Sequence, residues 1–489
     1  MWRASKLSKE IRMAEFTPTV PARVLPTVAV RDLPEPPRST WRVIGPGLVG
    51  AGVGLASGEF ILWPYIASQV GLVFIWGAAI GIITQWFLNM EIERYTLATG
   101  ETALTGFSRM WKHWGLVFVI MTLCSNLWPG WVTTSATMVT YLTGSGEGAV
   151  RWIAIGMLLL IAISLTMAPV IYILLERVIF VKIALVATLI VVAILFAINA
   201  ESWVELGRGL TVGARFPVPP LEFAVLMGAI AYAGAGGGQN LCQSNWIRDK
   251  GFGMGVYVPR LVSPVTGHEE AVSSTGFQFA PTKENLARWK QWWRFANIEQ
   301  AWTFAMVSFV TIALMSMLAH STVFGRPGLE NSIGFLEVEG QVLQSTVGTW
   351  FGLLFWVIGA LALFASAMGI VDYTSRLASD TIKTVYLRDR SVSVNRVYFY
   401  TVWAMALIGT VILLAGLDQP LILLVFSACF AAVMMFVYSI LLIILNRRAL
   451  PEAIKVRSYR LGALVWSVAF FGTLTVIVVV QQAQRLMGG

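Results

Sequence analysis

The stretch of sequence that decides the fold is residues 45–64, which read GPGLVGAGVGLASGEFILWP. It is long and apolar enough to begin a membrane span, yet it carries two features that weaken a membrane helix. Glycine is dense, and each glycine costs up to about 1 kcal/mol of helix stability relative to alanine. Glu59 lies near mid-membrane, where a carboxylate costs roughly 2.5 kcal/mol or more. Together these features predict a helix that is broken near Gly58 and has a function at the break.

The composition is that of a chain whose surroundings are mostly lipid. Of its 489 residues 57% are hydrophobic and 12% are charged, with a mean hydropathy of +0.72. A soluble domain carries about 25% charged residues. The sequence therefore predicts an all-α polytopic membrane protein with about eleven transmembrane helices. The apolar segments are 44–70, 72–98, 115–143, 150–168, 170–199, 220–247, 296–320, 347–371, 398–416, 419–446 and 461–482.

The distribution of positive charge predicts the orientation. When the N-terminus is placed in the cytoplasm and the segments alternate, all but five of the 35 Lys and Arg residues fall on the inner side. This is the positive-inside pattern of a multi-pass cell-membrane protein, here with its C-terminus outside. It accounts for the net charge of +9, so no nucleic-acid partner is expected. The five exceptions are Arg151, Arg208, Arg215, Arg326 and Arg485.

The segments group into two halves and two flanking parts. Residues 1–43 are polar, basic and rich in proline, which predicts a disordered cytoplasmic tail. Residues 44–199 form the first five-helix repeat, and residues 220–446 form the second, with a long cytoplasmic loop at 248–294. The tryptophans near the end of that loop suit a segment lying on anionic lipid, or a simple aromatic belt. Residues 461–482 form an eleventh helix.

A second glycine-rich interruption supports this division. Residues 234–240 read GAGGGQN and fall in the sixth segment, five segments after the first interruption. Transporters built from two inverted five-helix repeats break the first helix of each repeat and bind substrate between the breaks. The expected fold is thus that of the amino acid/polyamine/organocation transporters. Glycines also allow close helix packing, but packing does not explain Glu59.

The first two segments resemble the Nramp (natural resistance-associated macrophage protein) family of divalent-metal transporters. The resemblance covers about residues 45–105 and rests on the opening Gly45-Pro46-Gly47 and on the closing RYTLATG of residues 94–100. It implies eleven helices with a cytoplasmic N-terminus. The family's metal-binding Asp-Pro-Gly-Asn falls on residues 56–59, so that Ala56 stands where the family has its ligating Asp. The family's Met-Pro-His of the sixth helix is absent, which indicates a remote, Nramp-related clade with a rebuilt site.

Five residues form the candidate ion or substrate site: Glu59, Ala56, Gln239, Asn240 and Tyr232. Glu59 would ligate a cation or carry a proton; the alternative is a carboxylate paired only to hold the broken helix. Gln239 and Asn240 offer amide oxygens, or instead cap the second half-helix. Tyr232 is also an ordinary core aromatic, and Ala56 enters through the motif position alone. No resident cofactor is expected.

The charged residues around the breaks are few. The third segment has no Asp, Glu, Lys, Arg or His between His113 and Glu147, so no proton route is expected through it. The cores of the first, second and sixth helices contain no Lys or Arg, so no permanent buried salt bridge from them to Glu59 is expected. Asp372 is interpreted as an interfacial or loop-pairing residue.

These observations favour a secondary transporter or facilitator that works by alternating access. Its oxygen ligands suit hard divalent cations such as Mg²⁺, Mn²⁺ or Ca²⁺. A carrier of a small organic solute, such as an amino acid or amine, is the alternative. A membrane sensor is a third hypothesis, without a visible signalling domain. Nothing in the sequence indicates an enzyme. The expected partners are the transported ion or solute and the lipid bilayer.

Overall fold

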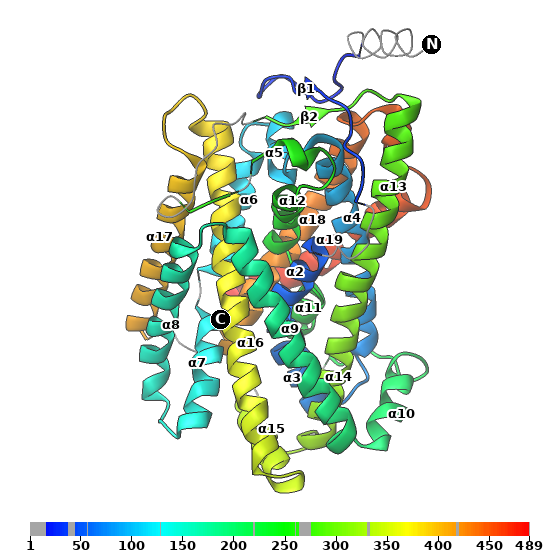
Figure 1. The fold of residues 1–489 in the computed structure, drawn as a ribbon. Helices are drawn as coiled ribbons and strands as arrows, with labels where there is room; N and C mark the ends of the chain where they lie inside the picture. The colour runs from blue at the N-terminus through cyan, green and yellow to red at the C-terminus, as the bar shows by residue number, and fades with distance from the viewer. Residues whose placement is uncertain are drawn as a thin grey trace.

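The computed structural model describes residues 16–37, 45–55, 57–127, 129–218, 221–259, 261–263, 275–329, 333–416 and 420–488. Within these residues the chain is helical except for loops and two short strands, β1 (Ala29–Val30) and β2 (Phe277–Gln278), which pair in parallel. The long helices stand side by side in one upright bundle, with the strands at one end (Figure 1).

Eleven membrane spans can be followed through the described residues. Nine are continuous enough and apolar enough to be recognised by length and composition. The other two are α4 and the broken pair α11 and α12. The all-α polytopic prediction is confirmed. In chain order the spans are α2 (Pro46–Gly54), η2 (Ser57–Leu62) and α3 (Trp63–Val70); α4 (Ile75–Thr99); α6 (Trp114–Asn126) and α7 (Gly130–Thr143); α8 (Gly148–Met167); α9 (Ile171–Phe196); α11 (Phe223–Ala231) and α12 (Gly238–Lys250); α13 (Lys283–Glu299), η4 (Gln300–Met306) and α14 (Val307–Thr322); α16 (Thr349–Thr381) and η5 (Ile382–Tyr386); α17 (Val394–Leu414); α18 (Pro420–Arg448); and α19 (Ser458–Gly488).

Short helices connect some of these spans. Their bounds are α5 (Ala103–Met110), η3 (Gly253–Tyr257), α10 (Ala200–Gly209), α15 (Phe335–Thr346) and η6 (Glu452–Ile454).

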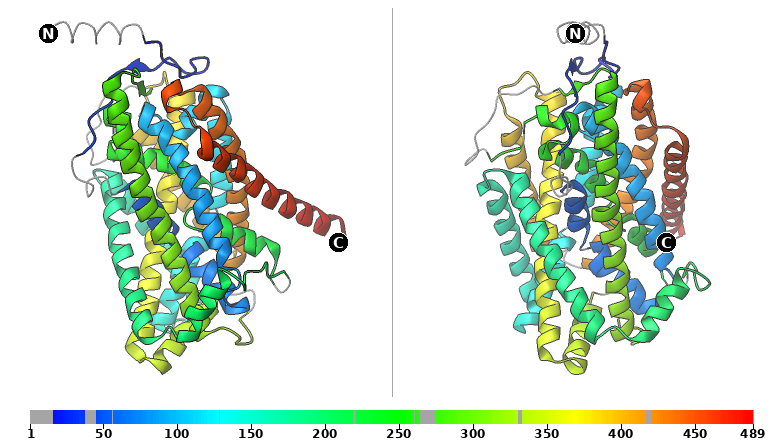
Figure 2. Two further views of the ribbon diagram at one scale, coloured as in Figure 1. Left: turned by 90° about the vertical axis from the view of Figure 1, so that its right-hand side faces the viewer. Right: turned by 45° about the vertical axis from the view of Figure 1, so that its right-hand side comes forward.

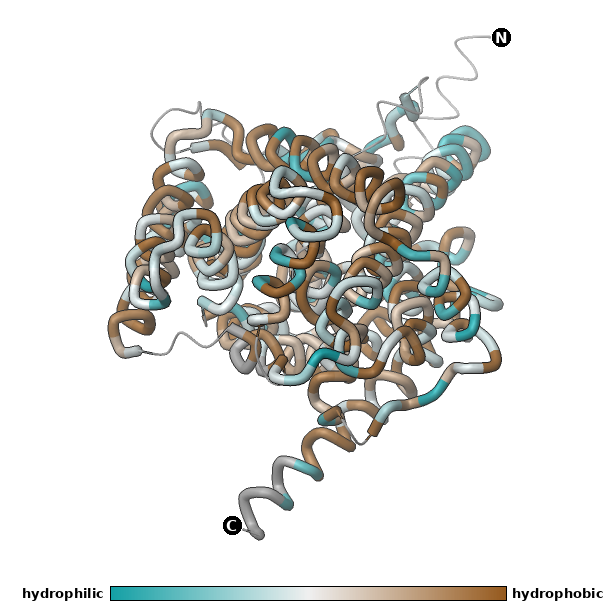
Figure 3. Tube along the Cα trace, turned by 90° about the horizontal axis from the view of Figure 1, so that it is seen from below, coloured by the Kyte–Doolittle hydropathy of each residue, from teal (hydrophilic) through white to brown (hydrophobic). Residues whose placement is uncertain are grey.

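The outer surface of the bundle is apolar. Large hydrophobic side chains on α8 and α9 are more than half exposed, among them Leu160, Phe180 and Leu195. Seen end-on, hydrophobic residues run around the outside of the bundle as well as through it (Figure 3). A water-soluble protein rarely leaves contiguous apolar surface of this kind uncovered. The exterior therefore suits the hydrocarbon core of a membrane.

The first and sixth spans are both broken, as predicted. The first half-helix α2 ends at Gly54, and regular α-helix resumes only at Trp63, after the π-helical turn η2. In the sixth span α11 ends at Ala231 and α12 begins at Gly238. The backbone between them has φ angles of +97° at Gly234 and +134° at Gly236, which only glycine adopts without strain.

The two breaks touch each other through their backbones. A Cβ atom built on Gly54 would lie 2.0 Å from the carbonyl oxygen of Gly234, and one built on Gly58 would lie 2.0 Å from that of Tyr232. Such a close approach is possible only because these positions carry no side chain. The prediction that the breaks face each other at the centre of the protein is confirmed.

The N-terminal segment is ordered over residues 16–37, so the expectation of a disordered tail is wrong there. It lies across the end of the bundle as a strap (Figure 2). Arg109 Nη1 donates to the carbonyl oxygens of Pro21 and Pro26, each at 2.9 Å, and Trp292 Nε1 donates to Pro34 at 2.9 Å. Val20, Leu25, Val28 and Leu33 are buried. Proline has no backbone N–H, so a proline-rich segment has few donors for its own carbonyl oxygens. Here side-chain donors of the bundle make those hydrogen bonds.

The seventh span begins earlier than the sequence indicated. Helix α13 starts at Lys283, inside the segment 248–294 that we expected to be a cytoplasmic loop, and α12 extends to Lys250. Trp289 and Trp292 are buried against Phe279 and Phe252, with ring centroids 5.9 and 5.5 Å apart. These tryptophans pack into the protein, so the interpretation of a segment lying on anionic lipid is not supported.

A pH dependence is expected from α15, which lies outside the spans. Burial raises the pKa of the Glu339 carboxyl to about 8, far above its ordinary value of 4.5. The folded protein keeps this proton up to about pH 8, whereas the unfolded chain releases it near pH 4.5. The contribution to stability is therefore present below pH 4.5 and is lost as the pH rises through 8. Thermal denaturation in detergent should show Glu339→Gln gaining a few degrees over the unmodified protein at pH 8 and little at pH 5.

The matched control is Glu337→Gln, on the same helix but partly exposed. Equal gains for both variants, or no gain at pH 8 for Glu339→Gln, would contradict this assignment.

Candidate functional site

The site is centred on Glu59, in the first turn of η2 just after the break in the first span. Its carboxylate is completely buried. The preceding residue, Gly58, lies against the carbonyl of Tyr232 at the start of the other break. The structure thus brings the sequence-predicted Glu59 to the junction of the two broken helices. Ala56 lies outside the described residues.

The structure reveals a charged neighbour of Glu59 that the sequence analysis missed. Lys182, on α9, was counted among the cytoplasmic charges, but it is only 2% exposed and interacts electrostatically with Glu59. The sequence predicts no basic partner for Glu59 from the first, second and sixth helices, and this one comes from the fifth. The sequence did contain a signal for this residue, because a lysine within a long apolar segment indicates a functional site.

The ammonium group of Lys182 is held by oxygens of the broken helix. Its Nζ donates to the carbonyl oxygen of Gly52 at 2.7 Å and to Ser366 Oγ. The hydroxyl of Ser366, on α16, donates in turn to the carbonyl oxygen of Val53 at 2.8 Å. These carbonyls belong to the last turn of α2, where a helix has no backbone donors left for them. Lys182 therefore ties α9 and α16 to the end of the first half-helix.

Asn240 stabilises the second break. Its Oδ1 accepts from the backbone N–H of Gly236 at 2.9 Å, and its Nδ2 donates to Asn89 Oδ1 at 2.7 Å. Gln85, one turn before Asn89 on α4, donates through Nε2 to the carbonyls of Ile230 and Ala231. Gln85 and Asn89 were not among the residues predicted from the sequence. Their i, i+4 spacing inside an apolar segment could have indicated a polar face that meets a broken helix.

Gln239 and Tyr232 reach different neighbours. Gln239 Nε2 donates to the carbonyl oxygen of Gly50 at 2.5 Å and so joins the two broken spans. The hydroxyl of Tyr232 lies 2.5 Å from Ser427 Oγ on α18. Of the four described residues of the predicted site, Gln239, Asn240 and Tyr232 therefore have different hydrogen-bond partners, and the four are not gathered at one point. Glu59 belongs to the first span, and Gln239 hydrogen-bonds to that span from α12. Asn240 hydrogen-bonds to Asn89 of α4, and Tyr232 lies by Ser427 of α18.

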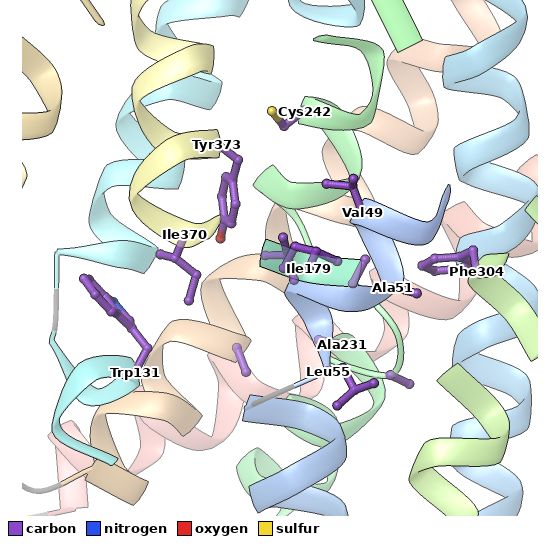
Figure 4. Close-up of a cluster of buried hydrophobic side chains, with 14 of the residues drawn as sticks. Val49, Ala51, Leu55, Trp131, Ile179, Ala231, Cys242, Phe304, Ile370 and Tyr373 are labelled. Atoms are coloured by element: carbon purple, nitrogen blue, oxygen red, sulfur yellow. The ribbon is translucent and has the colours of Figure 1, made fainter. Parts of the chain in front are cut away.

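A second polar group lies between α6 and α16. Asn126 Nδ2 donates to the hydroxyls of Tyr373 and Thr374, each at 2.9 Å. Figure 4 shows Tyr373 and Ile370 of α16 directed toward the broken helices, with Trp131 of α7 below them. The space around the breaks is thus bordered by amide and phenol groups together with apolar side chains.

An ion-pair cluster lies between the breaks and the strap. It joins α12 to α16 and consists of Arg248, Asp249, Asp372, Arg376 and Asp380. Arg376 Nε donates to Asp372 at 2.7 Å and Arg376 Nη1 donates to Asp249, while Arg248 Nη1 donates to Asp380 at 2.7 Å. Asp372 is buried and also accepts from the Tyr398 hydroxyl at 2.7 Å, so it pairs with residues of α16 and α17 and not with a loop, as the interpretation as an interfacial or loop-pairing residue had allowed.

The ligand set around the breaks is sparse for a metal. Among the described residues no group of three or more His, Cys, Asp and Glu side chains could hold an ion. Any ion at the breaks would therefore depend on Glu59 together with amide and backbone oxygens. Oxygen ligands of this kind suit hard cations rather than soft ones.

The architecture is that of the inverted-repeat fold, with helices one and six broken. No family model matches the sequence, and no curated protein matches it. Among solved structures the chain is similar to the manganese transporter of Eremococcus coleocola bound to an aromatic bis-isothiourea compound. The TM-score is 0.66 at 13% identity, over 96% of this chain and 92% of that one.

Two further structures share the fold. A histidine-to-alanine mutant of the same Eremococcus coleocola transporter has a TM-score of 0.64 at 13% identity, over 94% of this chain and 91% of that one. A nucleobase-cation-symport-1 family transporter, closed around bromovinylhydantoin, has a TM-score of 0.52 at 12% identity, over 91% and 94%. At sequence identities this low, the structural similarity establishes the fold alone. The substrate has to be inferred from the residues of the site.

Proposed function

We propose that this protein is a secondary transporter that carries a hard divalent cation, such as Mg²⁺, Mn²⁺ or Ca²⁺, across the cell membrane by alternating access. The observation that carries the proposal is the buried Glu59 carboxylate at the point where two broken helices meet. In the inverted-repeat fold this is the place where substrates bind. The similarity to a manganese transporter supports the same substrate class.

The proposed ligands are oxygens from both broken spans. Glu59 supplies the charge, and backbone carbonyls of the two breaks would complete the set. Asn240 Oδ1 already accepts a hydrogen bond from the backbone N–H of Gly236. Gln239 uses its Nε2 for its hydrogen bond to Gly50, so its amide oxygen is the more suitable ligand. Tyr232 borders the site from the second break. The positive-inside pattern supports an N-terminus in the cytoplasm and a C-terminus outside.

The second candidate is a carrier of a small organic solute. It is favoured by uncharged polar groups on the helices at and beside the breaks: Asn126 of α6 donates to the Tyr373 hydroxyl of α16, and the Tyr232 hydroxyl of the second break lies by Ser427 of α18. Such groups recognise amines and heterocycles by hydrogen bonding and aromatic contact.

The experiment is a binding and flux panel on the purified protein. Isothermal titration with Mg²⁺, Mn²⁺, Ca²⁺, amino acids and amines should give saturable binding for one or more divalent cations only. Proteoliposomes should take up the same cation, with the others competing. Binding of an amino acid or amine without any divalent cation would replace the first proposal with the second.

A further inference from the structure

A pocket lies between three membrane spans, away from the broken helices. Its volume is about 510 Å³, and its walls come from α6, from α17, and from η5 with the turn that follows it. Apart from Tyr400 and Thr401, the side chains that line it are apolar. Helix α17 stands at the edge of the bundle (Figure 1). Pockets for small ligands measure about 300–1,000 Å³, so this one is large enough to hold a ligand.

The opening of the pocket faces the lipid. Tyr400, Ala404 and Ile408 line it, are exposed, and recur at every fourth position, so they form one outward face of α17. Val397 and Met405 also line the pocket but are buried, so they form its inner wall. Both α6 and α17 pack against α16, and the pocket lies between them. Its opening therefore meets the acyl chains of the bilayer, and an apolar chain suits its lining.

The pocket is about as deep as one leaflet of the bilayer. From Val397 to Ile408 the lining follows α17 for about three turns, or about 16 Å at a pitch of about 5.4 Å. The hydrocarbon core of a bilayer is roughly 30 Å thick, and one leaflet contributes half of it. Leu387 and Val392, which precede α17, line the end of the pocket at the membrane surface. The pocket thus runs from the surface to about mid-membrane, as a fatty acyl chain does.

Basic side chains gather at the surface end of the pocket. From Lys383 to Arg396 the sequence has four basic residues and one acidic residue, Asp389. Arg388, Arg390 and Arg396 are exposed. Each is next to a lining residue in the chain or separated from one by a single position. Guanidinium groups bind phosphate oxygens through paired hydrogen bonds, so this end of the pocket suits a phosphate group.

Hydrogen bonds hold the surface end of the pocket in shape. Lys383 Nζ donates to the carbonyl oxygens of Leu387 and Arg390, at 3.0 and 2.8 Å, and so folds the turn that carries two of the arginines. The hydroxyl of Tyr386 lies 2.8 Å from His113 Nδ1, which joins η5 to the start of α6. The lysine is thus used to build the turn, and the exposed arginines beside it are left for a ligand.

We infer that this pocket binds one phospholipid with an anionic headgroup, from the leaflet at the end of the bundle that carries the strap. One acyl chain occupies the pocket, and the phosphate binds Arg388, Arg390 and Arg396. In the proposed orientation this is the cytoplasmic leaflet, whose negative surface potential attracts basic segments beside a membrane span. The inference goes beyond the proposed function, because the lipid is not the transported substrate and does not bind at the breaks.

The first test compares two lipids with identical acyl chains, phosphatidylglycerol and zwitterionic phosphatidylcholine, added to the purified protein in detergent. A ligand that binds only the folded state raises the melting temperature. We expect a gain of several degrees with phosphatidylglycerol and little with phosphatidylcholine. Native mass spectrometry should show one phosphatidylglycerol molecule retained by the protein. Equal gains with both lipids would overturn the inference. The buffers contain EDTA, so the outcome does not depend on the substrate panel.

A pair of tryptophan variants tests where the acyl chain binds. Ala404→Trp fills the pocket from an exposed position of α17, so it should fold and should lose most of the gain with phosphatidylglycerol. Leu407→Trp is the matched control, because Leu407 is exposed on the same helix but does not line the pocket. This control should keep the full gain. An Ala404→Trp variant that keeps it as well would show that the chain binds elsewhere.

A pair of double variants tests where the headgroup binds. Arg388→Gln/Arg390→Gln removes two charges from the mouth of the pocket and should lose most of the gain. Arg447→Gln/Arg448→Gln removes two charges from exposed positions at the end of α18 and should keep it. If the two double variants respond alike, the effect of phosphatidylglycerol comes from the overall charge of the surface, and the inference is wrong.

Discussion

Glu59→Gln should abolish binding and transport of the substrate cation while the protein still folds. Glutamine preserves the volume of the side chain and removes its charge, and Glu59 is the only carboxylate proposed as a ligand at the breaks. A divalent ion in a low-dielectric site depends strongly on such a charge. We expect binding to weaken by at least about a hundredfold, equivalent to about 2.7 kcal/mol. Calorimetric titration and proteoliposome flux at matched expression would measure both effects.

The interpretation needs two companion variants. Glu59→Asp keeps the charge but shortens its reach, so it should weaken binding less than Glu59→Gln does. Glu147→Gln, at the exposed start of α8, is the matched control and should leave binding unchanged. Because Lys182 interacts electrostatically with Glu59, the substitution could also change stability, so the melting temperature of each variant must be measured together with binding. A glutamine variant that binds and transports as well as the unmodified protein would make Glu59 a structural residue.

Gly54→Ala should be severely destabilising although it adds a single methyl group. That methyl would lie 2.0 Å from the carbonyl oxygen of Gly234, which is backbone and cannot rotate away. The two broken helices would have to separate, and overpacking of this kind costs about 1–3 kcal/mol or more. We expect a clear fall in the melting temperature and a loss of transport in the protein that remains folded. Thermal denaturation followed by fluorescence-detected chromatography would measure the first effect.

The matched control is Gly156→Ala, on α8. It is also a helical glycine, and a Cβ there has no neighbour within 4 Å. Because alanine favours helix more than glycine does, this variant should be neutral or slightly stabilised. If Gly54→Ala behaves like Gly156→Ala, the close contact between the breaks is not required for folding.

Much of the architecture could be predicted from the sequence. The apolar segments, the charge distribution and the two glycine-rich interruptions predicted eleven spans and paired breaks, and the structure has both. These features are local, because the length and hydropathy of a segment decide whether it can cross a membrane. The structures of the tail and of the segment 248–294 were predicted less well from their composition. Arg109 binds carbonyls of the strap and Phe252 packs on Trp292, contacts between residues far apart in the chain.

The candidate site was predictable only in part. The sequence by itself identified Glu59, because a carboxylate within an apolar segment is costly wherever the chain folds. It also determined where the backbone could break, since only glycine tolerates the φ angles found at Gly234 and Gly236. Only the tertiary structure decided what surrounds those positions. Lys182 lies far from Glu59 in the sequence and reaches the end of α2 because α9 packs against it. Whether a buried charge ligates an ion or is compensated by the protein depends on neighbours that are distant in the sequence. The hydropathy of the chain does not indicate which residues these are.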